Sequence, residues 1–113
     1  MARSATTATA VANIASVQTD APLVTAVPGF KIRVVAAVVV TGGSTTNVTF
    51  TTKGAGAGVP VTALLALAVR AAFVLPVNEH GWFETKAGEG LSVTTGGTTD
   101  TGFNVSYALI PAY

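Results

Sequence analysis

The residues best suited to chemistry gather around His80, the only histidine of the chain, which has Glu79 beside it and Glu84 four residues further on. A general base needs a second group that orients it and a pocket that shifts its pKa. No serine in a recognisable nucleophile elbow and no second histidine accompanies His80. Because Gly81 follows, we expect residues 78–81 to form a turn in which His80 faces solvent or caps the turn.

Two other patterns approach known catalytic motifs without matching them. The carboxylates Glu79, Glu84 and Glu89 lie in a turn-rich region, and their spacing carries no signal of a glycosidase pair. The GAGAG segment at 54–58 is followed by Val-Pro, whereas a phosphate-binding P-loop needs Gly-Lys-Ser/Thr at the start of a helix. We therefore expect a flexible loop at 54–58, no catalytic residue and no enzyme activity.

Cysteine, histidine and charge counts exclude several further classes of site. The chain has no cysteine and one histidine, so disulfide scaffolds, thiolate sites and multi-histidine metal sites within one chain are excluded, and we expect neither metal nor cofactor. Only 10% of the 113 residues are charged, with a net charge of +1, which argues against a nucleic-acid partner. Such a domain must hide much of its surface.

The elements that position these residues are predicted to be strands. The chain contains 17 Val and 18 Thr, and both residue types branch at Cβ and suit a pleated surface. Glycine and proline recur at short intervals, so that turns separate short alternating segments every 8–15 residues. This pattern indicates an all-β fold, an antiparallel β-sandwich or jelly-roll-like single domain spanning residues 21–113.

The strongest predicted strand is Phe30–Thr41. It begins with alternation and continues as an apolar run at 35–40, which suggests cover on both faces, by a second sheet or by a partner chain. The run is too short to span a membrane, and we expect no membrane partner. Residues 46–52 alternate as well, and the Gly-Gly-Ser between the two segments predicts a hairpin.

Later segments are predicted as shorter strands. Residues 90–95 and 103–109 alternate, and residues 82–85 lead out of the turn at 78–81. Residues 61–77 carry their large apolar side chains at odd positions, which favours two strands meeting near 68–72. The Ala and Leu content of this segment leaves a helix near 62–73 as the alternative.

Residues 1–20 are weakly apolar and rich in Ala and Thr. We expect them to form an extended N-terminal arm, mobile over its first ten residues, with a first strand near 11–17. Such an arm can also fold against a neighbouring subunit, and the sequence does not decide between these possibilities.

Adjacent aromatic residues, Trp82 and Phe83, are candidates for an interface. Neighbouring residues of a strand point to opposite faces, so one ring can fill the core while the other meets a loop or a neighbouring subunit. Packing is the ordinary role of such residues, and an interface anchor is the sharper alternative.

Aliphatic and basic residues of the Phe30–Thr41 segment are further interface candidates. They are Val35, Val38 and Val40 from the apolar run, together with Lys31 and Arg33. The basic pair can form a modest electrostatic rim for docking an acidic protein surface, or it can simply face solvent.

A series of short segments gives the chain a family resemblance: KIRV at 31–34, NVTF at 47–50, FVLP at 73–76, GWFET at 81–85, AGEGL at 87–91 and FNVSY at 103–107. In this order they resemble small virion proteins of tailed bacteriophages that decorate or cement the capsid. The resemblance implies a β-sandwich, self-association as a homotrimer, and binding to the major capsid protein on the capsid exterior. It carries no catalytic residues.

The expected function is therefore a non-enzymatic capsid decoration protein that stabilises the phage head. Trp82, Phe83 and the exposed half of the apolar run are expected at subunit contacts, and residues 1–20 at the capsid. The alternative is a receptor- or carbohydrate-binding tip domain of a head or tail fibre, which predicts an exposed aromatic platform around Trp82 and Tyr107.

Overall fold

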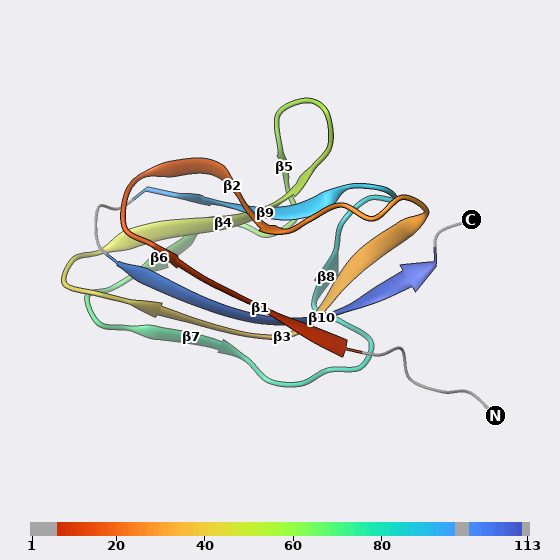
Figure 1. Cartoon of the computed structure of the whole chain (residues 1–113). Coiled ribbons are helices and arrows are strands. Elements are labelled where there is room, and N and C mark those ends of the chain that lie inside the picture. Colours follow the sequence, from red (N-terminus) through yellow and green to blue (C-terminus); the bar gives the residue numbers. More distant parts are fainter. Residues whose placement is uncertain (1–6, 97–99, 112–113) are drawn as a thin grey trace.

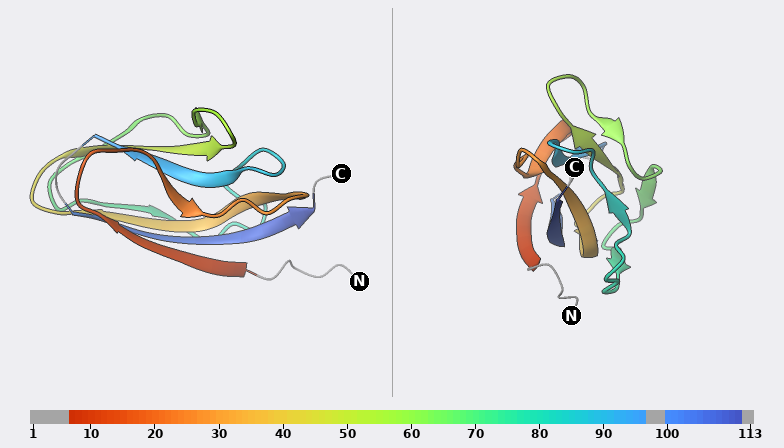
Figure 2. Two further views of the ribbon diagram at one scale, coloured as in Figure 1. Left: turned by 45° about the horizontal axis from the view of Figure 1, so that its top comes forward. Right: turned by 90° about the vertical axis from the view of Figure 1, so that its right-hand side faces the viewer.

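The computed structural model describes residues 7–96 and 100–111, and it places them in two facing β-sheets (Figures 1 and 2). The strands in chain order are β1 (Thr7–Ile14), β2 (Gln18–Val24), β3 (Phe30–Thr41), β4 (Thr46–Lys53), β5 (Val59–Pro60), β6 (Leu65–Leu67), β7 (Ala72–Leu75), β8 (Phe83–Glu84), β9 (Gly90–Thr95) and β10 (Thr101–Pro111). The expected all-β sandwich is confirmed.

The chain crosses repeatedly between the two sheets. Sheet I has the order β1-β10-β3-β7, with β8 also paired to β3; sheet II has the order β2-β9-β4-β5, with β6 also paired to β4. All of these pairs are antiparallel. The first four strands occupy the two sheets in turn, and β9 and β10 insert beside them, which is the strand arrangement of a jelly roll.

The core lies between the sheets and is built from the inward-facing residues of the long strands. Phe50 of β4 is fully buried, and its ring lies 6.1 Å from that of Phe103 in an edge-to-face arrangement and 5.1 Å from that of Phe83. Aliphatic side chains surround these rings: Val24, Ile32, Val34, Val39, Val48, Leu91, Val93 and Val105. The core therefore joins the two sheets through β-branched and aromatic residues that fit a pleated surface.

The positions of the long strands agree with the prediction, but the predicted hairpin does not form. β3 and β9 have the predicted bounds, and β4 and β10 extend slightly beyond them. However, β3 and β4 do not pair with each other, because the intervening turn carries the chain from sheet I to sheet II. The hairpin prediction is wrong, since local alternation identifies a strand but not the sheet that contains it.

The ambiguous segment at 61–77 consists of two strands, as predicted, and the alternative helix near 62–73 is wrong. β6 lies in sheet II and β7 in sheet I. Between them Arg70 has a φ of 49°, and its N–H donates to the carbonyl of Gly42 at 2.9 Å. A tight crossing between sheets thus replaces the helix that the Ala and Leu content would have allowed.

From Thr7 onward, the segment expected as an arm belongs to the sandwich. β1 pairs along its whole length with β10, and β2 pairs with β9, so the boundary expected at residue 20 does not separate two structural units. Alternate residues of β1, namely Ala10, Ala12 and Ile14, pack against the core. Small side chains gave this strand a weak apolar signal in the sequence. Residues 1–6 lie outside the described residues.

Candidate interaction surface

The outward face of sheet I carries a broad uncharged surface, which we call the outer face. Strand register places Val11, Asn104, Val38 and Val74 in one row across β1, β10, β3 and β7. The next row contains Asn13, Gly102, Val40 and Ala72, and a third contains Thr9, Ser106 and Ala36. No charged residue occurs in these three rows. Val11, Val74 and Val40 are 73%, 56% and 44% exposed.

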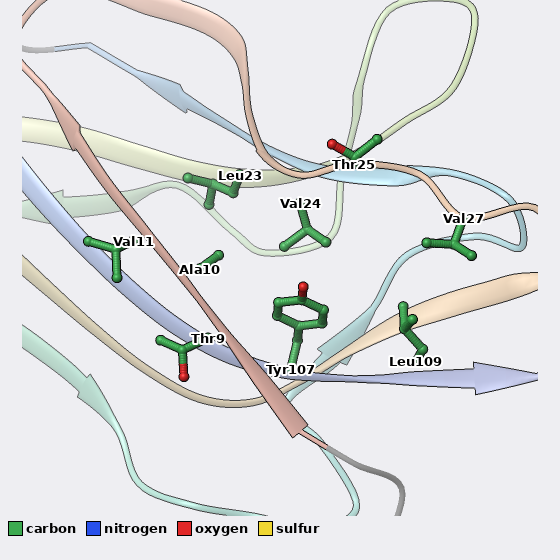
Figure 3. A pocket seen from close by; sticks show the side chains of 9 residues that line it. All are labelled: Thr9, Ala10, Val11, Leu23, Val24, Thr25, Val27, Tyr107 and Leu109. Atoms are coloured by element: carbon green, nitrogen blue, oxygen red, sulfur yellow. The ribbon is translucent and has the colours of Figure 1, made fainter.

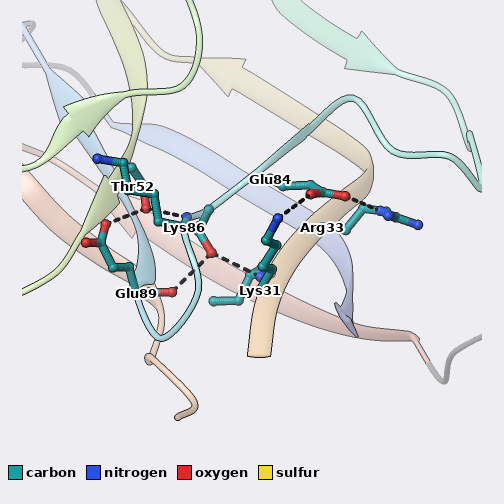
Figure 4. A network of polar contacts seen from close by, with 8 residues as sticks. Lys31, Arg33, Thr52, Glu84, Lys86 and Glu89 are labelled. Carbon is teal, nitrogen blue, oxygen red and sulfur yellow. Dashed lines mark hydrogen bonds and ion pairs between the residues drawn. The ribbon is translucent and has the colours of Figure 1, made fainter. Parts of the chain in front are cut away.

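Charges lie at one end of this face, where β3 meets β8 (Figure 4). Arg33 Nε donates to Glu84 Oε2 at 2.6 Å, and Lys31 Nζ lies 3.9 Å from Glu84 Oε1. The basic pair therefore shares one carboxylate, and the rim is an ion-paired cluster rather than two free cations. Such partly exposed pairs contribute little to stability, so their main effect is to fix where the charges stand.

A network of hydrogen bonds holds this end of the two sheets together (Figure 4). The Ile32 N–H on β3 donates to Thr85 Oγ1 at 3.0 Å, and this hydroxyl donates to the carbonyl of Glu89 at 3.1 Å. On sheet II, Thr52 Oγ1 donates to the Glu89 carboxylate at 2.8 Å and accepts from the N–H of Lys86 at 2.9 Å. The segment 84–90 thus fixes the charged end of the outer face.

The two adjacent aromatic residues have different roles. Phe83 is half-buried and packs on Phe50, so its main contact is with the core. Trp82 is 44% exposed, and its indole Nε1 donates to the carbonyl of Pro76 at 2.8 Å, which fixes the ring. Of the two, Trp82 presents more of its ring to a partner.

The three candidate valines of β3 differ in how far they are exposed. Val40 is exposed and Val38 is half-buried on the outer face, but Val35 is only 7% exposed. Between Ser106 and Tyr107 the register of β10 with β3 shifts past Val35, which forms a bulge. The buried positions of β3 are even-numbered before this bulge and odd-numbered after it, and Val35 itself is buried, which an uninterrupted apolar run does not reveal.

Sequence reasoning missed the contribution of the outermost strands, β1 and β7, to the outer face. Val11 was placed in a strand but not assigned to a surface, and Val74 was assigned no role. The signal that would have found them is strand register, because both face β3 or β10 across one row. Alternation along one strand does not reveal the register of that strand with its neighbours.

An open cleft of about 450 Å³ lies beside β1, where the two sheets separate (Figure 3). Leu23, Val24 and Val27 line it from the chain around the end of β2, and Tyr107 and Leu109 line it from β10. Thr9, Ala10 and Val11 form its β1 side. Tyr107 belongs to this cleft, whereas Trp82 lies beyond β3, so these two residues do not form one aromatic platform.

The residues with catalytic potential are not assembled into a site. His80 is exposed in a turn, where its N–H donates to Asn78 Oδ1 and the Gly81 N–H donates to the carbonyl of Asn78. Glu84 is occupied by the ion pairs. Within the part of the chain described, no group of three or more His, Cys, Asp or Glu residues is arranged to hold a metal ion.

The Gly-rich segment at 54–58 is an extended loop that projects from sheet II (Figure 1). Lys53 Nζ donates to the carbonyls of Gly54 and Gly56, and Asp20 Oδ2 accepts from the N–H of Gly58. The loop therefore binds its own lysine and an aspartate of β2, an arrangement unlike a phosphate cradle.

Comparison of the chain with protein-family models, curated proteins and solved structures yields no match. Among residues 7–96 and 100–111 there is no helix with the length and apolar character needed to cross a membrane.

Proposed function

We propose that this chain is a structural, non-enzymatic protein that decorates the exterior of a phage capsid and stabilises the head by binding the major capsid protein. The observation that carries the proposal is the uncharged outer face of sheet I. Exposed Val11, Val40 and Val74 lie on this face, with the ion-paired cluster at one end. An apolar centre with a polar margin is the usual composition of a protein-binding surface.

The fold supports this role. A jelly-roll sandwich presents a wide sheet face to a partner. The resemblance of the KIRV, FVLP and GWFET segments to phage decoration proteins points to the same function and implies association as trimers. Stabilisation would follow from mass action, because a protein that binds only the assembled shell shifts the equilibrium toward that shell.

The alternative, a carbohydrate-binding tip domain, is less well supported. Sugar rings stack on exposed aromatic residues, and the pair expected to form the platform is divided between the cleft and the far side of β3. Trp82, which is 44% exposed, therefore stands apart from Tyr107.

The copy number of the chain in purified particles tests the proposal, by quantitative mass spectrometry against the major capsid protein. We expect a ratio near one copy per capsid subunit. A handful of copies per particle would instead indicate a fibre or tail tip. Absence from the particle would exclude both functions.

A pair of matched variants tests the surface. Val40 and Val59 are 44% and 46% exposed, but Val40 lies on the outer face and Val59 on β5 of sheet II. We expect Val40→Glu to weaken binding to undecorated capsids about tenfold or more, since it buries a charge in the interface. Val59→Glu should bind like the unmodified chain. Equal binding by both variants would remove the outer face from the proposal.

A further inference from the structure

Most sheet edges in the described residues are short or interrupted. β5 and β8 have two residues each, β6 has three and β7 has four. β2 is longer, but Asp20 has a φ of 54°, Pro22 has no N–H to donate, and the register with β9 shifts twice. Shortness, proline and bulges are the means by which sheet proteins prevent their edges from pairing with other chains.

β1 has none of these protections. Its eight residues, TATAVANI, include no charge and no proline, and all of them stand in unbroken register with β10. β10 covers one side of β1, and no other strand of the described ranges pairs with its second side. A long, neutral, regular edge of this kind is a template for a further strand.

We propose that β1 pairs antiparallel with β1 of a second copy of this chain, around a two-fold axis at Val11. A two-fold axis perpendicular to the sheet keeps each residue on its own face. Val11, which is 73% exposed, then packs against its equivalent on the outer face. Thr9 faces Asn13 of the second copy, and Ala10 faces Ala12, so small or neutral side chains oppose each other and no like charges meet.

The cleft beside β1 supports this register. The cleft opens along the inner side of β1, and Tyr107 forms part of its wall (Figure 3). In the proposed pair, Ile14 of the second copy faces Ala8, and Ala8 is the register partner of Tyr107. Pairing therefore brings an apolar side chain toward a cleft that Leu23, Val24 and Leu109 line together with two threonines and Tyr107. The two-fold axis repeats this contact in the cleft of the second copy.

This inference does not rest on the proposed capsid binding. An antiparallel pair of identical strands closes with two copies, whereas the resemblance to decoration proteins implies three. The oligomeric state of the purified chain therefore separates the two expectations, and failure of one leaves the capsid experiment unaffected.

Analytical ultracentrifugation over micromolar to millimolar concentrations tests the pair. We expect a concentration-dependent dimer, and we expect Val11→Lys to raise its dissociation constant about tenfold or more, because two cations then meet at the axis. The matched control is Val74→Lys, which lies in the same row of the outer face at the opposite edge and should leave the dimer unchanged.

A cysteine variant gives a second readout that does not depend on the first. The chain has no cysteine, so Val11→Cys introduces a single thiol. Directly opposite residues of antiparallel strands have Cβ atoms roughly 4.5–5.5 Å apart, close enough for a disulfide after a small adjustment. Mild oxidation should link Val11→Cys into a dimer and leave Val74→Cys mainly monomeric.

A chain that remains monomeric throughout, or forms trimers, would overturn the proposal. The proposal would also be overturned if a dimer forms but Val11→Lys leaves its dissociation constant unchanged and Val11→Cys gives no cross-linked dimer on oxidation.

Discussion

Asp20 illustrates how a single residue is held in an unusual backbone conformation. Its φ of 54° lies in the left-handed region, which residues other than glycine rarely adopt. Its carboxylate accepts a hydrogen bond from Thr51 Oγ1 at 3.0 Å and another from the Gly58 N–H at 2.9 Å. These bonds connect β2, β4 and the loop at 54–58, so the conformation of Asp20 is supported by three segments of sheet II.

Gly58→Ala should break this connection. A Cβ at position 58 would lie 2.7 Å from Asp20 Cγ and 3.0 Å from Thr51 Oγ1, so the carboxylate must move. We expect the free energy of unfolding to fall by about 1–3 kcal/mol, measured by urea denaturation. Gly56→Ala is the control in the same loop, because a Cβ there meets nothing within 4 Å. Similar losses in both variants would contradict the role of Asp20.

The neighbouring aromatic residues should respond differently to truncation. Phe83 is half-buried against Phe50, and we expect Phe83→Ala to cost about 2–3 kcal/mol of stability. Trp82 is exposed, and Trp82→Ala should cost about 1 kcal/mol or less, chiefly through its hydrogen bond to Pro76. Thermal unfolding followed by circular dichroism measures both. A larger loss for Trp82 than for Phe83 would reverse the assignment of core and surface.

At the scale of elements, the crossing from β6 to β7 carries strain that can be relieved. Arg70 has a φ of 49°, where a non-glycine residue costs roughly 1–2 kcal/mol, and glycine costs about 0.5–1 kcal/mol in chain entropy. Arg70→Gly should therefore raise the free energy of unfolding by about 0.5–1 kcal/mol in urea titrations. Arg70→Ala keeps the strained backbone and should give no increase. A loss of stability in the glycine variant would show that the arginine side chain itself is needed.

Element prediction from the sequence succeeded where alternation was strong. β3 has the predicted bounds because charged and apolar residues alternate at its start and glycines mark its end. β2 was missed because Asp20 and Pro22 interrupt its pattern, and these are the same residues that protect it as an edge. The sheet in which each strand lies was not predictable, since the principal pairings join segments distant in the chain.

The same dependence on pairing between distant strands limits the prediction of the surface. Val38 and Val40 were named as candidates from the apolar run at 35–40, and the structure has them on the outer face because the inward positions change from even to odd numbers at the bulge. Val35 was misplaced by the bulge, and Phe83 was offered as an interface residue although it packs on Phe50. A row such as Val11, Asn104, Val38 and Val74 depends on register between strands, which one sequence does not reveal.

At the scale of the whole molecule, the two ends of the described chain close the sandwich together. β1 pairs with β10 over eight residues, so the first strand rests on the last. Its inner residues Ala10 and Ala12 lie opposite Val105 and Phe103, both fully buried in the core. Closure therefore requires contacts between residues about ninety positions apart, and such contacts form slowly in folding.

Removing β1 should accordingly destabilise the entire domain and not merely release an arm. Deletion of residues 1–14 uncovers the edge of β10 and the core residues beneath β1. We expect it to lower the free energy of unfolding by more than about 3 kcal/mol, a large part of the stability of a domain this size, or to prevent folding. Deletion of residues 1–6 leaves all of the described strands intact and is the control. Urea denaturation followed by circular dichroism compares the three chains. If the chain lacking residues 1–14 is as stable as the full chain, β1 is an accessory to the sandwich, and the arm expected from the sequence is restored.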